Sequence, residues 1–176
     1  MPPALDPAAL ALPVLQDPAC SAHVRELLRA RWQPSTDDAV AAARVAARAR
    51  TGAIVFVAVH HGNFPSLEFL APALRARGLT TLAIYLQGEE VGEGFDHTER
   101  CGGSLSRLTA LLRALPADTA IYLQAHARWV WLGQLVAAVA PQVRLVQEIW
   151  DWMDAFVEPA HAQDFVDDGV FSHAEL

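Results

Sequence analysis

Short apolar runs alternate with longer amphipathic ones along most of the chain. Each short run is continuous and rich in β-branched residues, which indicates strands buried on both faces; the predicted strands span 53–59, 79–86, 119–123 and 143–147. Apolar residues recur at helical spacing elsewhere, which predicts helices over 23–32, 39–50, 67–77, 104–115 and 127–140. This alternation predicts an α/β fold, a Rossmann-like doubly wound parallel sheet in a three-layer arrangement, preceded by N-terminal helices.

One segment interrupts the alternation. Residues 87–103 contain five glycines and four glutamates without an apolar period, so we predict a long mobile loop there. A doubly wound sheet usually runs outward from its first strand and then crosses to the other side. We assign that crossover to residues 87–116, which places the first predicted strand beside the third. We divide the chain into an N-terminal arm with helices, residues 1–51, and a Rossmann-like half-domain, residues 52–176.

The composition excludes several classes of protein. Hydrophobic residues make up 53% of the 176 residues and charged residues 19%, which excludes an intrinsically disordered chain. No apolar run reaches the ~18–20 residues of a membrane-spanning helix, so we expect no direct membrane span. The net charge of −7 argues against a nucleic-acid partner, because phosphates need clustered basic residues. The N-terminus lacks the early positive charge of a signal peptide, and two distant cysteines fit a reducing compartment, so we predict a cytoplasmic protein.

The densest polar cluster directly follows the first predicted strand. It consists of His60, His61, Gly62 and Asn63. Because ligands of doubly wound sheets bind beyond the carboxyl ends of the strands, we predict that these four residues bind substrate. The helix that follows adds unpaired N–H groups and a partial positive charge, which suit a phosphate or a carboxylate. The alternative is that His60 packs in the interior and His61 is merely exposed.

A second polar group follows the third and fourth predicted strands. We predict His126 as the catalytic residue, because a neutral histidine can take a proton from a substrate hydroxyl; Arg128 can hold an anionic group of the substrate. Glu148 and Asp151 lie just past the fourth predicted strand and can accept hydrogen bonds from substrate hydroxyls. Two alternatives stay open: His126 bonds a nearby backbone group, and the two acids are solvated at the start of a helix.

Other chemistries lack their sequence signals. The chain contains no GxSxG, P-loop, HExxH or CxxC motif, so we expect no metal site and no cofactor. Trp129 and Trp131 lie two apart in a predicted helix, where residues at that offset do not share a face. Trp150 and Trp152 repeat the offset. We therefore expect one ring of each pair at the surface or against an adjoining module.

Two stretches resemble the N-terminal domain of GT-B glycosyltransferases, especially the large retaining class that includes sucrose and mannosyl transferases. AIVFVAVHHGNFPSLEFLAPALRARGLTTLAIY is similar to the family's first strand–helix–strand unit, and DTAIYLQAHARWVWLGQLVAAVAPQVRLVQEIWD to a later unit with a histidine-containing turn. Together they cover residues 52–152. The resemblance implies an acceptor-binding half with His126 in the catalytic cleft. Its first loop, His60 to Asn63, lies near the donor diphosphate but departs from the Gly-Gly form often seen there.

The resemblance also implies partners. The substrates are a nucleotide-sugar donor and a glycosyl acceptor, and a second GT-B domain, in cis or in trans, holds the donor. We find no second strand–helix series here, so we expect a piece of a longer transferase or a stand-alone acceptor half, inactive in isolation. The alternative function is a non-catalytic Rossmann-like binding or interaction module. The surplus of tryptophan favours this alternative, as does the chain from residue 148 onward, which has eight acids and no arginine.

Overall fold

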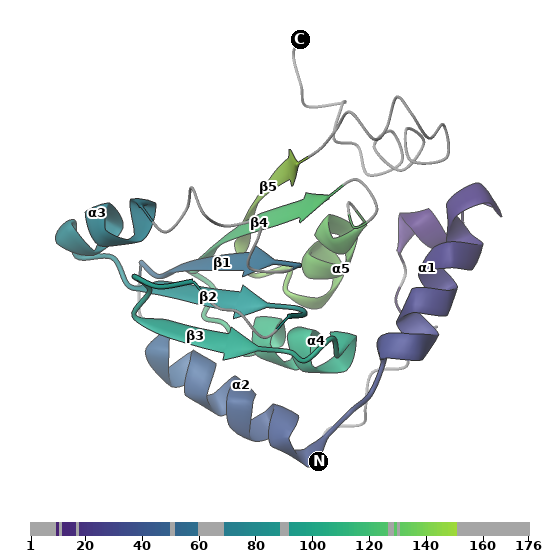
Figure 1. Cartoon of the computed structure of the whole chain (residues 1–176), viewed down its shortest axis with the longest axis horizontal. Helices are drawn as coiled ribbons and strands as arrows, with labels where there is room; N and C mark the ends of the chain where they lie inside the picture. The colour runs from purple at the N-terminus through teal and green to yellow at the C-terminus, as the bar shows by residue number, and fades with distance from the viewer. Residues whose placement is uncertain are drawn as a thin grey trace, which may run out of the picture.

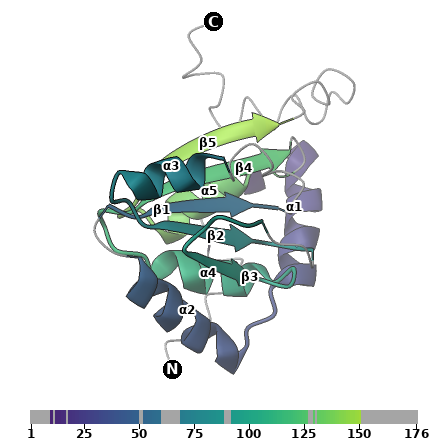
Figure 2. The same cartoon turned by 60° about the vertical axis from the view of Figure 1, so that its left-hand side comes forward.

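Five parallel strands form the centre of the protein. The structure is a computed structural model that describes residues 10, 12–16, 18–49, 52–59, 69–88, 92–126, 129 and 131–150. The strands lie in the order β3-β2-β1-β4-β5 (Figure 1, Figure 2) and span Ile54–Ala58 (β1), Thr81–Tyr85 (β2), His97–Arg100 (β3), Ala120–His126 (β4) and Arg144–Trp150 (β5). The predicted α/β class with a parallel sheet is confirmed.

The pairing of the strands agrees with the predicted winding. β1 pairs with β2 on one side and with β4 on the other, so that Ile54 lies opposite both Thr81 and Ala120. The first predicted strand therefore lies beside the third, as expected. β1 is buried from its second residue onward and β2 throughout, which explains why both read as continuous apolar runs rather than as alternating ones.

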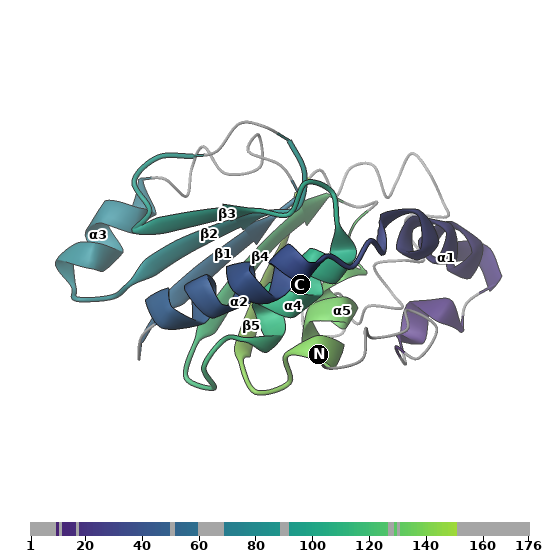
Figure 3. The same cartoon turned by 90° about the horizontal axis from the view of Figure 1, so that it is seen from below.

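One face of the sheet carries the main hydrophobic core. Helices α2 (Thr36–Arg48), α4 (Leu105–Arg113) and α5 (Leu132–Val139) lie on this face (Figure 3). Every second strand residue points toward them, and the strand side chains in this cluster include Val55, Val57, Leu82, Ile84, Ile121 and Leu123. Helix α1 (Pro18–Arg31) and the short 3-10 helix η2 (Pro13–Leu15) add their apolar side chains to the same cluster.

The opposite face, called here the second face, carries a smaller cluster. Its buried members are Phe56, Ala58, Ala83 and Tyr85. Helix α3 (Leu70–Ala76) covers part of it through Leu74, and the segment before β3 covers another part through Phe95. The Phe56 and Phe95 rings meet at 5.3 Å between centroids in a tilted arrangement. Toward β5 this face is more open, since Val146 is 49% exposed.

The prediction of a long mobile loop over 87–103 is wrong, because β3 lies within it. β3 pairs with β2 in parallel register, with Tyr85 opposite Arg100. The sequence His-Thr-Glu-Arg has no apolar period, and its buried member is the charged Glu99 rather than a hydrophobic residue. Ion pairs replace apolar contacts here, so the hydrophobic pattern gave no sign of a strand.

Helix boundaries differ from the predicted ones for local reasons. α2 begins three residues earlier than predicted because Ser35 caps it: the Ser35 hydroxyl accepts from the Asp37 N–H at 3.2 Å, and the Ser35 N–H donates to Asp38 Oδ2 at 3.0 Å. α3 is followed by Gly78, whose φ of +81° favours glycine. α5 begins at Leu132 rather than at 127.

Helix α1 lies beyond the carboxyl ends of the strands. In Figure 1 and Figure 3 the strands run toward α1, which stands at the end of the sheet away from α3. Val24 and Leu28 anchor the helix in the main core, each 2% exposed. The last residue of α1 thereby comes close to the segments that follow β2 and β4.

Candidate functional site

Most of the predicted site lies outside the described residues. His60, His61, Gly62, Asn63 and Arg128 belong to segments that the structure does not describe. His126 is described through its backbone, as the last residue of β4, opposite Trp150 of β5. Glu148 is the predicted site residue with a described side chain, and it lies in β5.

The strand order reverses between β1 and β4. The chain leaves β1 toward β2 and leaves β4 toward β5, so two connections depart in opposite directions from neighbouring strands. In open parallel sheets, ligands bind beyond the carboxyl ends of the strands at such a switch point. Ala58 of β1 and Gln124 of β4 are paired beside it. The switch point expected from the winding is therefore present in the strand order. Of the two polar segments expected to face each other across it, residues 60–66 lie outside the described part of the chain, and residues 124–126 belong to β4 rather than to a loop.

A row of residues crosses the second face near this carboxyl edge. The backbone register joins one residue from each strand, in the order Arg100, Tyr85, Ala58, Gln124 and Glu148. We call these five residues the polar row. Since Ala58 contributes only a methyl group, no bulky side chain of β1 stands between Tyr85 and Gln124 at the switch point.

Glu148 receives two hydrogen bonds from β4. The Tyr122 hydroxyl donates to Glu148 Oε2 at 2.5 Å, and Gln124 Nε2 donates to the same oxygen at 2.8 Å. Tyr122 and Gln124 lie two apart in the strand and therefore share a face. Burial, followed by the hydrogen bond to Glu148 and the negative charge of that group, raises the pKa of Tyr122 well above its usual value. The tyrosine thus remains a donor at every ordinary pH.

The Gln124 side chain is fully buried, with 0% exposed, and its Oε1 has no hydrogen-bond partner among the described residues. The carboxylate of Glu148 fixes the orientation of this amide. Rotating the group would turn its oxygen against the carboxylate and remove the bond from Nε2. The unpaired atom is therefore an acceptor that faces away from Glu148.

The position of Glu148 corrects one prediction and one alternative. β5 extends to Trp150, three residues beyond the predicted strand, so Glu148 lies inside the strand and not past its end. The reading of Glu148 as a solvated acid that opens a helix is wrong, because the residue is half-buried in a strand and hydrogen-bonded. Within the protein its carboxylate accepts a bond from the Tyr122 hydroxyl, and acceptance of a bond from a substrate hydroxyl stays a prediction.

Sequence reasoning missed Tyr122 and Gln124. Both were assigned to an apolar strand or its end, and neither was considered as a site residue. A signal was nevertheless present: two polar groups at an offset of two on one strand face the same side, and Glu148 lies in the same register of the next strand. Polar residues inside a buried strand of this kind need partners.

A second group of side chains occupies the carboxyl edge on the side of α1. Arg31 Nη1 donates to Gln87 Oε1 at 3.0 Å, and the Arg31 guanidinium lies 5.2 Å from the centroid of the Trp129 ring. A Cβ atom on Gly103 would come within 3.1 Å of the same Arg31 nitrogen. Arg31 thereby contacts the segments after β2, β3 and β4.

The helical placement expected for Trp129 and Trp131 is wrong. Trp129 lies in a 3-10 turn and both residues precede α5, so the helical offset rule does not apply to them. Their rings stack at 5.7 Å between centroids with 27° between planes. Trp131 is only 1% exposed, and Trp129 is half-buried against Arg31. Neither ring of this pair is a free surface aromatic. The side chains of Trp150 and Trp152 lie outside the described part of the chain.

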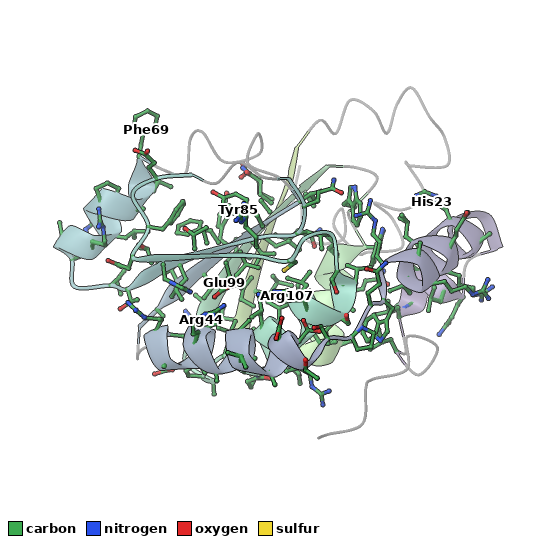
Figure 4. All side chains as sticks on the ribbon, turned by 60° about the horizontal axis from the view of Figure 1, so that its bottom comes forward. His23, Arg44, Phe69, Tyr85, Glu99 and Arg107 are labelled. Carbon is green, nitrogen blue, oxygen red and sulfur yellow. The ribbon has the colours of Figure 1, made fainter. Side chains whose placement is uncertain are left out.

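An ion-pair cluster holds the edge strand to the helices. Figure 4 shows Arg44 of α2 and Arg107 of α4 near Glu99 of β3. Arg44 contacts Glu99 Oε1 at 2.8 Å, Arg107 Nη2 lies 3.5 Å from Oε2, and His97 Nε2 lies 3.2 Å from Oε1. Burial alone favours the neutral acid, but the hydrogen bonds from Arg44 and His97 outweigh it and hold the pKa of Glu99 below its usual value. The cluster lies on the face opposite the polar row, and it joins β3 to α2 and α4.

A hollow of about 360 Å³ lies at the amino ends of the strands, away from the switch point. Its lining consists of Arg48, Arg75, Gly78, Leu79, Thr80 and Asp96. The two arginines lie near the carboxyl ends of α2 and α3, where a positive charge offsets the helix dipole. Arg75 also approaches Asp96 at 3.7 Å. These contacts give both arginines a role in stabilising the fold, so we do not assign them to a ligand site.

No family model, curated protein or solved structure matches the chain. Among the residues that the structure describes, no three histidine, cysteine, aspartate or glutamate side chains are placed to hold a metal ion. In the same part of the chain, no helix combines the length and the apolar character needed to cross a membrane.

Proposed function

We propose that this chain is the acceptor-binding domain of a glycosyltransferase and that it holds the acceptor at the carboxyl edge of β4 and β5. The observation that carries the proposal is Glu148, a half-buried carboxylate held in place by Tyr122 and Gln124 beside the switch point. A carboxylate fixed by two bonds is preorganised to accept further bonds from sugar hydroxyls. The Rossmann-like, doubly wound three-layer form is part of the proposal and is supported by the strand order and by the core clusters on both faces.

The negative charge at this edge favours binding of the acceptor here and of the nucleotide-sugar donor by a second domain. Glu148 repels the diphosphate of a nucleotide-sugar donor, and the whole chain carries a net charge of −7. A second, donor-binding domain or a partner then supplies the groups that hold the diphosphate, and the isolated chain is inactive. His126, two residues beyond Gln124 in β4, is the proposed catalytic residue, and His60, His61, Gly62, Asn63 and Arg128 complete the substrate-binding set.

The test measures which ligand binds and where. Isothermal calorimetry of the full chain with UDP-sugars and GDP-sugars should show no binding tighter than the millimolar range. Chemical-shift mapping with a panel of methyl glycosides should move amide signals at the carboxyl ends of β4 and β5. Micromolar binding of a nucleotide-sugar, or glycoside shifts confined to the amino ends of the strands, would contradict the proposal.

The second candidate is a non-catalytic binding or interaction module, and one observation favours it. Phe69 is 82% exposed and the adjacent Leu70 49% exposed, at the start of α3. Figure 4 shows Phe69 projecting away from the sheet. An exposed apolar pair of this kind suits contact with another protein. Two variants distinguish the candidates. If Phe69→Ser abolished binding of a partner protein and Glu148→Gln left glycoside binding unchanged, the second function would be the correct one.

A further inference from the structure

The outer side of β5 is a long edge of the sheet. β5 is the last strand in the strand order, and no strand among the described residues pairs with its outer side (Figure 2). It spans seven residues without a proline, whereas β3 at the other edge spans four and has a buried carboxylate held by arginines. An edge of this length offers its backbone groups to a further strand.

The backbone of β5 determines how a further strand would add. The Arg144 N–H donates to the Thr119 carbonyl at 3.1 Å, so the backbone groups of Arg144 point toward β4. Successive strand residues point their backbone groups to alternate sides, so those of Leu145 point outward and those of Val146 point toward β4. An antiparallel strand would therefore meet Val146 in a pair without mutual backbone bonds, where opposing side chains lie closest.

Three side chains of β5 line this edge on the second face. Arg144, Val146 and Glu148 lie two apart in the strand and share a face. Arg144 is exposed, Val146 is 49% exposed and Glu148 is half-buried. Along the strand the row reads cation, apolar group, anion. A two-fold axis through Val146 reverses that order, so that each cation meets an anion and the apolar group meets its own copy.

We infer that β5 pairs in antiparallel fashion with β5 of a second copy of this chain, with Val146 opposite its own counterpart and Arg144 opposite Glu148. Directly opposed side chains have Cβ atoms about 4.5–5.5 Å apart, which an arginine and a glutamate can bridge. A shift of two residues in either direction sets Val146 against a charged residue and loses both ion pairs. Larger shifts bring like charges together at Arg144 or at Glu148, so the charges select one register.

A second copy fits this edge better than an unrelated strand does. An unrelated strand would need the same charges in reverse order, and a second copy supplies them by symmetry. The inference goes beyond the proposed function and does not depend on it. A carboxylate has about four acceptor positions, and Tyr122 and Gln124 occupy two of them at Glu148 Oε2. Oε1 can therefore accept from a guanidinium and from a substrate hydroxyl.

Sedimentation equilibrium of the full chain measures the association. Because one edge strand buries little area, we expect a dimer, twice the 19.1 kDa of the chain, with a micromolar dissociation constant. Val146→Lys sets two ammonium groups against each other at the two-fold axis and should leave a monomer. Val40→Lys is the matched control, because Val40 is 58% exposed in α2, and it should dimerise as wild type does.

Charge reversal tests the ion pairs. Arg144→Glu sets two carboxylates against each other on both sides of the axis and should raise the dissociation constant of the dimer by about 10-fold or more. Arg29→Glu makes the same change at an exposed position in α1 and should leave the dissociation constant unchanged.

Engineered cysteines test the register. In a Cys20→Ser background, Val146→Cys should form a disulfide between two chains on mild oxidation. The Cα atoms of such a pair lie about 4.5 Å apart, within the span of a disulfide. Arg144→Cys, oxidised at a concentration at which it is dimeric, should not cross-link, since its two copies lie roughly 14 Å apart along the strands.

Four results would overturn the inference. These are a monomer at about 0.5 mM, a dimer that persists in Val146→Lys, a dissociation constant that Arg144→Glu leaves unchanged, and a dimer that cross-links through Arg144→Cys but not through Val146→Cys. Slow hydrogen exchange at Leu145 in a monomer would add that another part of the chain covers the edge. If Val146→Lys fails to fold, the Arg144→Glu and cysteine variants decide the question. Glycoside binding by a monomer would leave the proposed function in place.

Discussion

At the scale of single residues, the bond between Tyr122 and Glu148 is the most informative contact of the site. It joins the central part of the sheet to its β5 edge with a short, charge-assisted geometry of 2.5 Å. The same side chain also makes an aromatic contact, since the Tyr122 ring lies 5.9 Å from that of Phe56. Tyr122 thus belongs both to the apolar cluster of the second face and to the candidate site.

Tyr122→Phe should lower the free energy of unfolding by about 1–2 kcal/mol at neutral pH, because one bond to a charged group is lost while the ring is kept. Urea denaturation measures this difference. The chain contains no lysine, so tyrosine and cysteine are the side chains that titrate between pH 9 and 11. The raised pKa of Tyr122 means that its contribution is fully present below the ordinary pKa of 10.0 and is lost as pH rises above it.

The pH series provides the control for this prediction. Wild type should lose stability as the pH rises above about 10, and Tyr122→Phe should lose less of it over the same range. Parallel curves for the two proteins would show that the Tyr122 hydroxyl has the same pKa in the folded and the unfolded state.

Cys101 should be unreactive in the folded protein. It is 3% exposed, and burial raises the pKa of its thiol to about 12, so neither access nor thiolate is available. In a Cys20→Ser variant, which leaves Cys101 as the single thiol, a disulfide reagent at pH 8 should react fully in urea. In buffer the reaction should be at least ~100-fold slower, because it requires opening of the fold. Rapid reaction in buffer would show that Cys101 is accessible.

The sequence predicted this site only in part, for reasons visible at particular residues. Glu148 was predicted to accept bonds from substrate hydroxyls because it was placed just past a buried strand; in the structure it lies inside β5 and accepts a bond from the Tyr122 hydroxyl, and its contact with substrate stays a prediction. Gln124 and Tyr122 were missed because burial of polar side chains depends on a partner in the neighbouring strand, and a partner requires the register. Tyr122 and Gln124 precede Glu148 by 26 and 24 residues, and the sequence alone does not state that these positions face each other.

At the scale of elements, β3 differs from the other strands in what holds it. Its buried side chain, Glu99, reaches α2 and α4 through arginines, whereas the neighbouring β2 is held by apolar side chains. This explains why four strands were found from hydrophobic runs and the fifth was not. The predicted spans of β4 and β5 were too short for a related reason. The carboxyl ends of these strands contain polar residues, Gln124 and Glu148, which pair with each other in the sheet.

Glu99→Gln should loosen β3 selectively. The variant removes the carboxylate that Arg44 and Arg107 share, although Arg107 keeps Asp38 at 3.8 Å, and should lower the free energy of unfolding by about 1–3 kcal/mol. Hydrogen exchange at the β3 amides should accelerate more than at the β1 amides. Glu93→Gln, an exposed change of the same type in the preceding segment, should have an effect within about 0.5 kcal/mol.

The acid limb of the stability curve tests the same cluster. Because the pKa of Glu99 is held below its ordinary value of 4.5, its contribution is present above that pH and is lost as pH falls through the lower, folded-state value. Wild type should therefore lose stability more steeply below pH 4.5 than Glu99→Gln does. Equal slopes would assign the acid sensitivity to other carboxylates.

At the scale of the whole molecule, the pairing of β1 with β4 was predictable, whereas the β3 edge and the placement of α1 were not. The winding follows from general rules for parallel sheets, and the pairing of β1 with β4 obeys them. No rule states where a helix before the first strand packs. α1 lies at the carboxyl edge because Val24 and Leu28 enter the main core and Arg31 reaches Gln87 and Trp129.

Arg31→Ala should free the end of α1 from the sheet. The variant loses a hydrogen bond and a cation–π contact, together worth about 1–2 kcal/mol. The emission of the Trp129 and Trp131 pair should change, and proteolysis between α1 and α2 should become faster. Arg29→Ala, two residues earlier on an exposed position, is the matched control and should change neither. Identical emission in all three proteins would show that Arg31 does not hold the edge.

The polar character of β3 also bears on how the protein behaves at high concentration. A strand at the border of a sheet offers unpaired backbone groups to any other molecule with a strand to add, and such addition leads to aggregates. Here that border is four residues long and carries an inward-facing carboxylate locked by two arginines. An incoming strand would find few free backbone groups on this short, charged edge strand. The chain therefore resists growth into fibrils from this side of the molecule.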